Sequence, residues 1–326
     1  MTQRIGKLPV LVISAHSRCN CRCGMCDIWR TAGSRQFTFA DLQRHLDDIR
    51  ELGVEWVVFT GGEALMNPDL FEMARVLRGV GVRVTVLTSG LLLGRYAREI
   101  VAHVDDVIVS LDGPRGVHDR IRGVIGAYDQ LAGGLRRVQA LSPEYPASAR
   151  CTVQKANHAA LVDTAYAAQS LGLNSISFLA ADVSSDAFNH APDMVTLRSQ
   201  SLLLTSREIS RLQAEIGRLS DDPIASMVAE PPAKLRRIVE YFRALASRSE
   251  PQAPQCNAPW VSAVLDYDGV VRPCFFHPPI GNVNGSSLRA VLNSESALAF
   301  RGNLDIASNP VCRRCVCSLH REEAVA

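Results

Sequence analysis

The sequence has little net charge, no long hydrophobic run and almost no lysine. Its 326 residues carry 35 basic and 33 acidic side chains, a formal net charge of +2, and only three of the basic residues are lysines. A charge this close to zero creates no strong field for nucleic acid or an anionic membrane, so neither is expected as a partner. The apolar stretch at residues 8–15 is too short to span a bilayer and precedes no signal cleavage site, so we expect a cytoplasmic protein.

Cysteine, in contrast, is abundant and unevenly distributed. Ten cysteines are present, and seven of them lie in two short segments, residues 19–26 and 312–317. Disulfides are disfavoured in a reducing compartment, where crowded thiols more often bind metal. We therefore predict metal sites. The cysteines in these segments are Cys19, Cys21, Cys23, Cys26, Cys312, Cys315 and Cys317, with Cys151, Cys256 and Cys274 between them.

Short β-branched segments alternate with amphipathic segments over the first two-thirds of the chain, a pattern typical of parallel α/β folds. The order of these segments fits a partial or complete α/β barrel without any long unstructured loop. We predict strands at residues 10–16, 56–60, 82–88, 106–111, 147–154 and 174–180. We predict helices between them at residues 39–52, 68–78, 95–101, 127–141 and 159–171.

The pattern changes after residue 182. Residues 183–193 are polar and irregular, and helical periodicity returns at residues 197–219 and 233–246. A hairpin pattern follows at residues 261–266 and 270–273, turning at Tyr-Asp-Gly. We therefore divide the chain into a barrel core (1–182), a helical insertion or linker (183–253) and a small metal-binding domain (254–326).

The fifth predicted strand has one polar face and one apolar face. Ser148, Arg150 and Thr152 alternate along it with Ala149 and Cys151. A parallel strand that faces only core is apolar on both sides, so a polar face indicates a lumen that holds a polar ligand.

Three cysteines of the first segment, Cys19, Cys23 and Cys26, have the spacing CxxxCxxC. They follow the first predicted strand, where an α/β barrel exposes its catalytic loops. Three thiolates are one too few to close a 4Fe-4S cluster, so one iron keeps an open position for a substrate or cofactor. Thr-Gly-Gly-Glu stands at residues 60–63, after the second predicted strand. Together these motifs resemble the radical S-adenosylmethionine (SAM) superfamily.

The resemblance implies a partial (β/α)6 radical SAM barrel whose 4Fe-4S cluster is bound by Cys19, Cys23 and Cys26. It also implies a bound SAM, with its amino group at the Gly-Gly-Glu motif and its ribose at residues 110–112. Arg150 is expected near the SAM carboxylate, and the strand at residues 177–179 near its adenine. The residues that the resemblance assigns to the cofactor are Thr60, Gly61, Gly62, Glu63, Ser89, Ser110, Asp112, Arg150 and Leu179. We interpret Cys21 as a bystander, because the three-cysteine motif is complete without it.

A second set of cysteines, Cys256, Cys274, Cys312 and Cys315, surrounds the predicted hairpin. Its pattern is similar to the twitch form of the SPASM extension, in which a hairpin and a C-terminal CxxC enclose one auxiliary 4Fe-4S cluster. A zinc site is the alternative, because four cysteines on a hairpin and a CxxC serve zinc equally well. Cys317 leaves the choice of ligand open, since Cys315 and Cys317 can also serve.

The resemblance further implies reductive cleavage of SAM to a 5′-deoxyadenosyl radical, which takes a hydrogen atom from the substrate. An external donor of flavodoxin or ferredoxin type supplies the electron. Dehydrogenation, epimerisation and carbon–carbon bond formation all stay open as outcomes. For an epimerisation the candidate hydrogen donors are Cys151, Cys21 and Cys317. Cys151 lies on the apolar side of its strand, where a buried core cysteine is the simpler interpretation.

We expect a small carbohydrate-like natural product as the substrate, because twitch-bearing relatives often act on sugars. The first predicted strand also starts near residue 10, which leaves no room ahead of it for a peptide-binding domain. A peptide-modifying maturase of the SPASM type is the alternative. A second alternative is a non-catalytic scaffold that binds zinc or a cluster.

Overall fold

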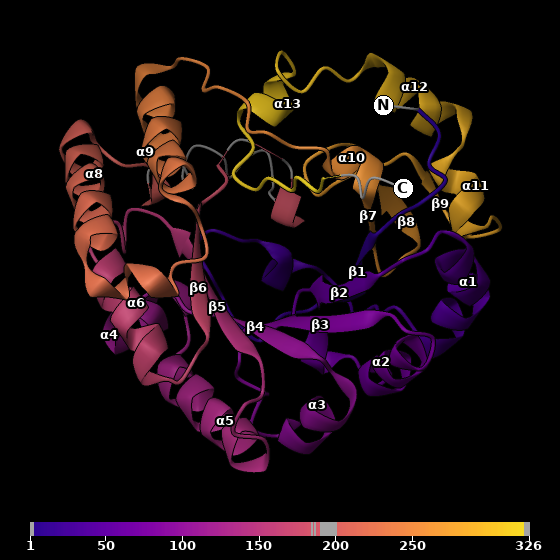
Figure 1. Cartoon of the computed structure of the whole chain (residues 1–326), viewed down its shortest axis with the longest axis horizontal. Coiled ribbons are helices and arrows are strands. Elements are labelled where there is room, and N and C mark those ends of the chain that lie inside the picture. Colours follow the sequence, from indigo (N-terminus) through magenta and orange to yellow (C-terminus); the bar gives the residue numbers. More distant parts are fainter. Residues whose placement is uncertain (1–2, 184, 186, 190–200, 323–326) are drawn as a thin grey trace.

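One curved sheet organises the computed structural model, which describes residues 3–183, 185, 187–189 and 201–322 (Figure 1). Its strand order is β6-β5-β4-β3-β2-β1-β7-β8-β9. The strands β1 to β6 are parallel, and each is hydrogen-bonded to the next in the sequence. This succession confirms the predicted partial (β/α)6 barrel. The six strands are β1 (Val10–His16), β2 (Trp56–Gly61), β3 (Arg83–Thr88), β4 (Asp106–Ser110), β5 (Ala147–Val153) and β6 (Ser175–Ala180).

Helices cover the outer face of this sheet (Figure 1). They are α1 (Phe39–Glu51), α2 (Leu70–Gly79), α3 (Ala97–His103), α4 (Arg115–Arg122), α5 (Ala127–Leu141) and α6 (Leu161–Ser170). The core lies between the helices and the sheet, where Val57, Phe59 and Ile13 have no exposed surface. Burying this apolar face is what places the opposite, more polar face of the strands toward the lumen.

The C-terminal domain continues the sheet beyond β1. Strand β7 (Ser262–Leu265) pairs in parallel with β1, with Val10 opposite Ser262. The hairpin predicted from the sequence is present as β7 and β8 (Val270–Arg272), and β9 (Gly281–Asn282) adds a short antiparallel strand. The helices of this domain are α10 (Ala258–Val261), α11 (Leu288–Leu292), α12 (Glu295–Asn303) and α13 (Pro310–Arg313).

The segment predicted as an insertion or linker packs against the open edge of β6. Its long helices, α8 (Ser206–Asp221) and α9 (Pro232–Ser247), lie against each other. Between them, Val228 forms a parallel bridge with Ile176, and the Glu230 carboxylate accepts a hydrogen bond from the Phe178 N–H at 2.8 Å. These contacts satisfy backbone groups that an exposed edge strand would leave unpaired.

Helices α10 to α13 of the C-terminal domain were not predicted, and two helices of the barrel and the insertion also differ from the prediction. Helix α4 was not predicted, because the residues it buries are His118, Ile121 and Arg122, two of them polar. The helix predicted at residues 197–219 begins at Ser206, since the Thr205 side chain caps it and accepts a hydrogen bond from the Glu208 N–H. The part of that prediction at residues 197–200 lies outside the described residues. Three-residue 3-10 turns occur at Ile28–Arg30, Ala64–Met66 and Ala187–Asn189, with a longer one at Pro223–Met227.

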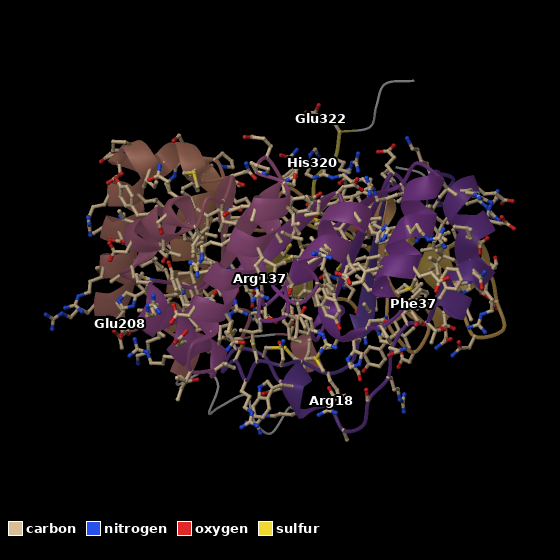
Figure 2. All side chains as sticks on the ribbon, turned by 90° about the horizontal axis from the view of Figure 1, so that it is seen from below. Arg18, Phe37, Arg137, Glu208, His320 and Glu322 are labelled. Atoms are coloured by element: carbon tan, nitrogen blue, oxygen red, sulfur yellow. The ribbon has the colours of Figure 1, made fainter. Side chains whose placement is uncertain are left out.

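The loops at the carboxyl ends of the strands lie on one side of the molecule. Figure 2 shows Arg18, in the loop after β1, at one edge and His320 and Glu322 at the opposite edge. In the described residues, no helix combines the length and the hydrophobicity that crossing a membrane requires.

Candidate functional site

The loop after β1 brings the first group of cysteines together. Cys21 lies between Cys19 and Cys23, and its N–H donates to the Cys19 Sγ at 3.4 Å. The Cys26 N–H donates to the Cys23 carbonyl at 3.3 Å, which closes the turn that carries the last cysteine. The thiols are not equivalent. Contact with the Cys21 thiol, and secondarily the charge of Arg122, lowers the pKa of Cys23 to about 7, whereas burial raises the pKa of Cys26 to about 12.

A buried arginine of α4 lies beside this loop. The Arg122 guanidinium approaches the Cys23 Sγ at 3.8 Å through Nη1 and the Asp112 carboxylate at 2.5 Å through Nη2. Its Nε is buried and has no hydrogen-bond partner in the described structure. Arg122 was not predicted as a site residue, because nothing in its local sequence pattern marks it. A buried cation with a spare donor fits a site that holds a negatively charged thiolate cluster.

Glycines 61 and 62 form the cradle on which the cysteine loop rests. A Cβ atom at Gly62 would lie 2.1 Å from the Arg18 carbonyl oxygen, and one at Gly61 would lie 2.7 Å from the His16 carbonyl oxygen. The Gly62 N–H donates to the His16 carbonyl at 2.8 Å. The glycine pair is therefore required by the close passage of two backbone segments, and it keeps the motif next to Cys19.

Glu63 is engaged inside the protein and not at the surface of the lumen. One carboxylate oxygen accepts hydrogen bonds from the Leu65 N–H and the Thr88 hydroxyl, and the other accepts from the N–H and hydroxyl of Ser89. Four donors occupy the acceptor positions of one carboxylate. A role of the Glu63 side chain toward SAM stays a prediction, and in this structure the carboxylate serves contacts within the protein. The Glu63 side chain joins β2 to the turn after β3. The part of the motif that can contact a ligand is then the backbone of residues 60–62.

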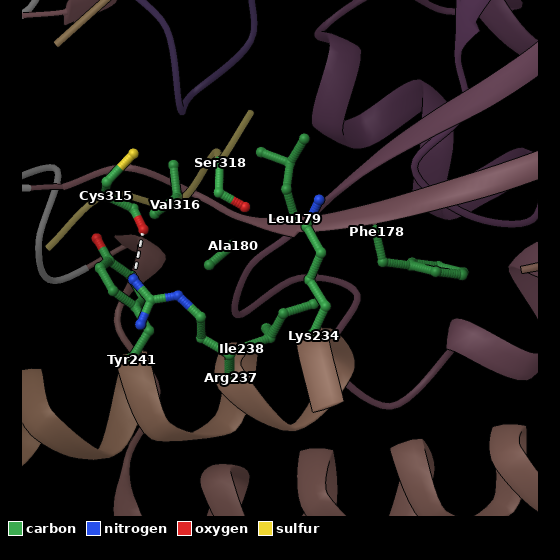
Figure 3. A pocket seen from close by; sticks show the side chains of 10 residues that line it. All are labelled: Phe178, Leu179, Ala180, Lys234, Arg237, Ile238, Tyr241, Cys315, Val316 and Ser318. Carbon is green, nitrogen blue, oxygen red and sulfur yellow. Dashed lines mark hydrogen bonds between the residues drawn. The ribbon is translucent and has the colours of Figure 1, made fainter. Parts of the chain in front are cut away.

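Ser110, Arg150 and Leu179 share the half-buried face of neighbouring strands. Ser110 pairs with Arg150 in the register of β4 and β5. The Arg150 Nε donates to the Ser177 hydroxyl of β6 at 3.3 Å, so the guanidinium lies across two strands. Leu179 lies two residues further along β6 on the same face, beside the small cavity of Figure 3. The structure thus brings these three predicted residues together on the lumen side.

Cys151, one of the predicted hydrogen donors, lies where the structure favours the simpler interpretation of a core cysteine. It alternates with Arg150 on β5, has no exposed surface and belongs to the hydrophobic core. Burial raises the pKa of its thiol well above the usual value. A thiol that faces the helices cannot return a hydrogen atom to a substrate in the lumen, so we assign Cys151 to packing.

The second group of cysteines gathers beside the C-terminal hairpin. Burial raises the pKa of Cys274 to about 11 and that of Cys312 to about 12, and nearby Cys256 contributes to both. The His277 Nε2 lies 3.3 Å from the Cys312 Sγ. The Cys315 thiol hydrogen-bonds to the Cys317 carbonyl. All five cysteines of this region therefore lie close together, and the choice between Cys315 and Cys317 stays open.

Helix α9 anchors the loop that carries the last cysteines. The Arg237 guanidinium donates to the Cys315 carbonyl at 2.8 Å and to the Arg313 carbonyl at 3.3 Å (Figure 3). Arg237 is half-buried, and burial lowers its pKa. The insertion therefore supports the second cysteine group directly.

A short turn of the insertion connects the two cysteine groups. The Phe188 carbonyl accepts a hydrogen bond from the Asp27 N–H at 3.1 Å, next to Cys26. Its ring stacks on Phe275 at 6.3 Å and meets Phe276 edge-on at 6.2 Å. These two phenylalanines directly follow Cys274, so Phe188 contacts both loops.

In the described part of the chain, no three His, Cys, Asp or Glu side chains form a group that could hold a single metal ion. The fit to clusters rests instead on the donor set. The first loop offers three thiols of the CxxxCxxC motif beside a buried arginine, and the second region offers four or five thiols. Thiolates are the ligands of iron–sulfur clusters, and three of them leave one iron open.

Two family profiles match the chain. Residues 13–155 match the Radical SAM superfamily, and residues 256–316 match SPASM, an iron-sulfur cluster-binding domain. Among curated proteins, the Fe-coproporphyrin III synthase of Methanosarcina barkeri is 34% identical over 139 residues, which cover 41% of this chain and 34% of that protein. The GTP 3′,8-cyclase of Peptoclostridium acidaminophilum is 32% identical over 145 residues, covering 41% of this chain and 44% of that protein. The chain spans less than half the length of these curated relatives.

Solved structures share the fold over nearly the whole chain. Streptococcus suis SuiB bound to S-adenosylmethionine has a TM-score of 0.68 at 13% identity, covering 96% of this chain and 73% of that one. The anSMEcpe structure with bound AdoMet and the Cp18Cys peptide has a TM-score of 0.64 at 15% identity, covering 89% and 81%.

Proposed function

We propose that this chain, which carries a radical SAM domain followed by a C-terminal SPASM iron-sulfur domain, is an enzyme that abstracts a hydrogen atom from a small polar substrate. The two domains imply SAM, a 4Fe-4S cluster and auxiliary cluster binding. When bound, the first cluster and SAM supply a 5′-deoxyadenosyl radical. One observation carries the proposal: Cys19, Cys23 and Cys26 lie in a single loop whose start, at Arg18 and Cys19, packs against Gly62.

The chain's own residues would bind and orient the cofactor. The backbone carbonyl groups of residues 60–62 are the acceptors that we assign to the SAM amino group, because the Glu63 oxygens and the Gly62 N–H already have partners. Arg150 offers a cation for the SAM carboxylate, and Ser110, its partner in register, offers a hydroxyl for the ribose. Holding the reacting atoms in place and excluding water supplies the protein's share of catalysis.

A carbohydrate-like substrate is the proposal that the lumen supports. Ser148, Arg150 and Thr152 of β5 and Ser177 of β6 present hydroxyl and guanidinium groups on the lumen face. A substrate with many hydroxyl groups matches such a surface, because each buried polar group needs a partner. Dehydrogenation, epimerisation and carbon–carbon bond formation are all compatible with it.

A peptide substrate is the second candidate. SuiB bound to its precursor peptide SuiA has a TM-score of 0.67 and covers 96% of this chain. The assay that separates the two candidates is 5′-deoxyadenosine formation above the uncoupled rate. It is run in parallel on a panel of sugar nucleotides and aminoglycosides and on a panel of short peptides. A rise with the sugars alone supports the carbohydrate proposal, and a rise with peptides alone overturns it.

The electron donor that we propose is an acidic flavodoxin or ferredoxin. Arg18, Arg22, Arg30 and Arg35 are exposed along the loop that carries the first cysteines. The one acid of this loop, Asp27, is buried and pairs with Arg30 at 3.3 Å. Such a basic surface attracts an acidic partner, and the attraction weakens as salt is added.

Anaerobic reconstitution tests the proposed function. We expect about eight iron and eight sulfide atoms per chain, together with reductive cleavage of SAM. Cys23→Ala should abolish cleavage, and Cys274→Ala should lower iron to about half. Bound zinc without cleavage would instead establish a non-catalytic scaffold. Loss of all iron in both variants would indicate that the variants had unfolded, and circular dichroism of the apoproteins measures this.

A further inference from the structure

Asp112 and Arg122 form a buried ion pair whose other end reaches a cluster cysteine. Asp112 has no exposed surface and Arg122 is 8% exposed. The Arg122 Nη2 lies 2.5 Å from the Asp112 carboxylate, and its Nη1 lies 3.8 Å from the Cys23 Sγ. The Thr152 N–H also donates to the Asp112 carboxylate, at 2.9 Å. One carboxylate oxygen therefore accepts a hydrogen bond from the protein, and the other, Oδ2, is buried against Arg122 as an ion pair but has no hydrogen-bond partner in the described structure.

The backbone around this pair is in direct contact with the cysteine loop. The Arg122 carbonyl accepts a hydrogen bond from the Arg22 N–H at 2.8 Å. Gly123 ends α4 in the left-handed region, at φ +64°, and a Cβ atom there would lie 2.7 Å from the Arg22 carbonyl oxygen. The end of α4 therefore fixes the loop at Arg22, the residue before Cys23, and the guanidinium is aimed at the Cys23 sulfur from a rigid element.

We propose that Asp112 and Arg122 are positioning residues that set the reduction potential of the first cluster, and that Asp112 does not bind the ribose of SAM. The inference rests on the proposed function. Reduction adds one negative charge to the cluster. A buried cation beside a thiolate ligand stabilises that added charge, and a buried carboxylate at the far end of the guanidinium offsets part of the effect.

The two members of the pair should then shift the potential in opposite directions. Asp112→Asn removes the offsetting negative charge and is expected to raise the midpoint potential. Arg122→Met removes the cation and is expected to lower it. For each variant we expect at least about a tenfold change in the reduction equilibrium, which is about 59 mV for one electron. The dissociation constant of SAM should stay within about twofold of the parent value, because the proposal gives neither side chain a contact with the cofactor.

The experiment is a redox titration of the reconstituted full chain, followed by electron paramagnetic resonance of the reduced cluster, with SAM binding measured separately. Opposite shifts with unchanged SAM affinity support the proposal. An unchanged potential in both variants overturns it, as does a tenfold loss of SAM affinity in Asp112→Asn without a shift.

Arg122→Lys covers the case in which Arg122→Met loses iron. Lysine keeps the charge but cannot bridge Asp112 and Cys23 with a planar fork. Because lysine keeps the charge, a near-parental potential in Arg122→Lys together with a raised potential in Asp112→Asn supports the proposal, and a parental potential in Asp112→Asn overturns it. The readout needs no substrate and no SAM cleavage. If the parent chain itself forms no reducible 4Fe-4S cluster, the result contradicts the proposed function as a whole. A reducible cluster whose potential does not respond to the variants contradicts only the role assigned to Asp112 and Arg122.

Discussion

Gly62→Ala should displace the loop that carries the first cysteines. The new Cβ atom would lie 2.1 Å from the Arg18 carbonyl oxygen, and ordinary contact begins at 3.4 Å, so the loop must retreat by about 1.3 Å. The retreat strains the hydrogen bond from the Glu63 N–H to the Arg18 carbonyl, which measures 2.9 Å. Overpacking of this kind costs about 1–3 kcal/mol, and a lost hydrogen bond adds about 1 kcal/mol.

The effect on the activation barrier should be about as large as the effect on stability. A displacement of about 1 Å at a reacting group lowers rates by about 100-fold. We therefore expect Gly62→Ala to reduce SAM cleavage by about two orders of magnitude, while urea unfolding of the apoprotein shows a loss of about 3 kcal/mol. Gly24→Ala is the matched control, because Gly24 lies in the same loop and a Cβ atom added there would meet nothing within 4 Å. Equal cleavage rates in the two variants would refute the steric reasoning.

Three further predictions concern other parts of the chain. Arg237→Met should lower the iron content from about eight to about four atoms per chain, because it frees the loop of the second cysteine group. Arg243→Met, on the same helix, is the control and should keep about eight. Equal iron contents in the two variants would contradict this prediction. Burial lowers the pKa of His118 to about 4 from 6.5, so protonation favours the unfolded chain. The stability of the apoprotein should be complete above pH 6.5 and fall by about 3 kcal/mol toward pH 4, and His118→Gln should flatten this urea-unfolding profile. Cys21→Ser should retain about eight irons while Cys26→Ser loses about half, and loss of iron in Cys21→Ser would make that thiol a ligand.

Local patterns predicted the barrel and the cysteine groups well. Strand β1 lies at residues 10–16 as its short β-branched, apolar run indicated, and the six strands occur in the predicted order. The cysteine spacing and the Gly-Gly-Glu motif located the first loop and its cradle, because both are set within a few residues of sequence.

Contacts between distant segments could not be predicted in the same way. Helix α4 buries His118 and Arg122, so its sequence has no apolar stripe from which the helix could be predicted. Cys23 and Arg122 are 99 positions apart, and Cys315 and Arg237 are 78 apart, so neither contact has a local signal. The expected roles of Glu63 and Asp112 followed their motifs, whereas the structure shows four donors on the Glu63 carboxylate and an ion pair between Asp112 and Arg122.

The two cysteine groups are supported by arginines that contact different atoms. Variants of the two arginines should therefore change different measured properties. Arg122 lies against a sulfur atom, so its charge acts on the cluster electrostatically. Arg237 donates to two main-chain carbonyls, so it holds the shape of a loop. Replacing Arg122 should change how easily an electron enters while iron remains, and replacing Arg237 should change how much iron remains. Because α4 and α9 lie outside both cysteine motifs, cluster chemistry in this chain depends on helices that the motifs do not contain.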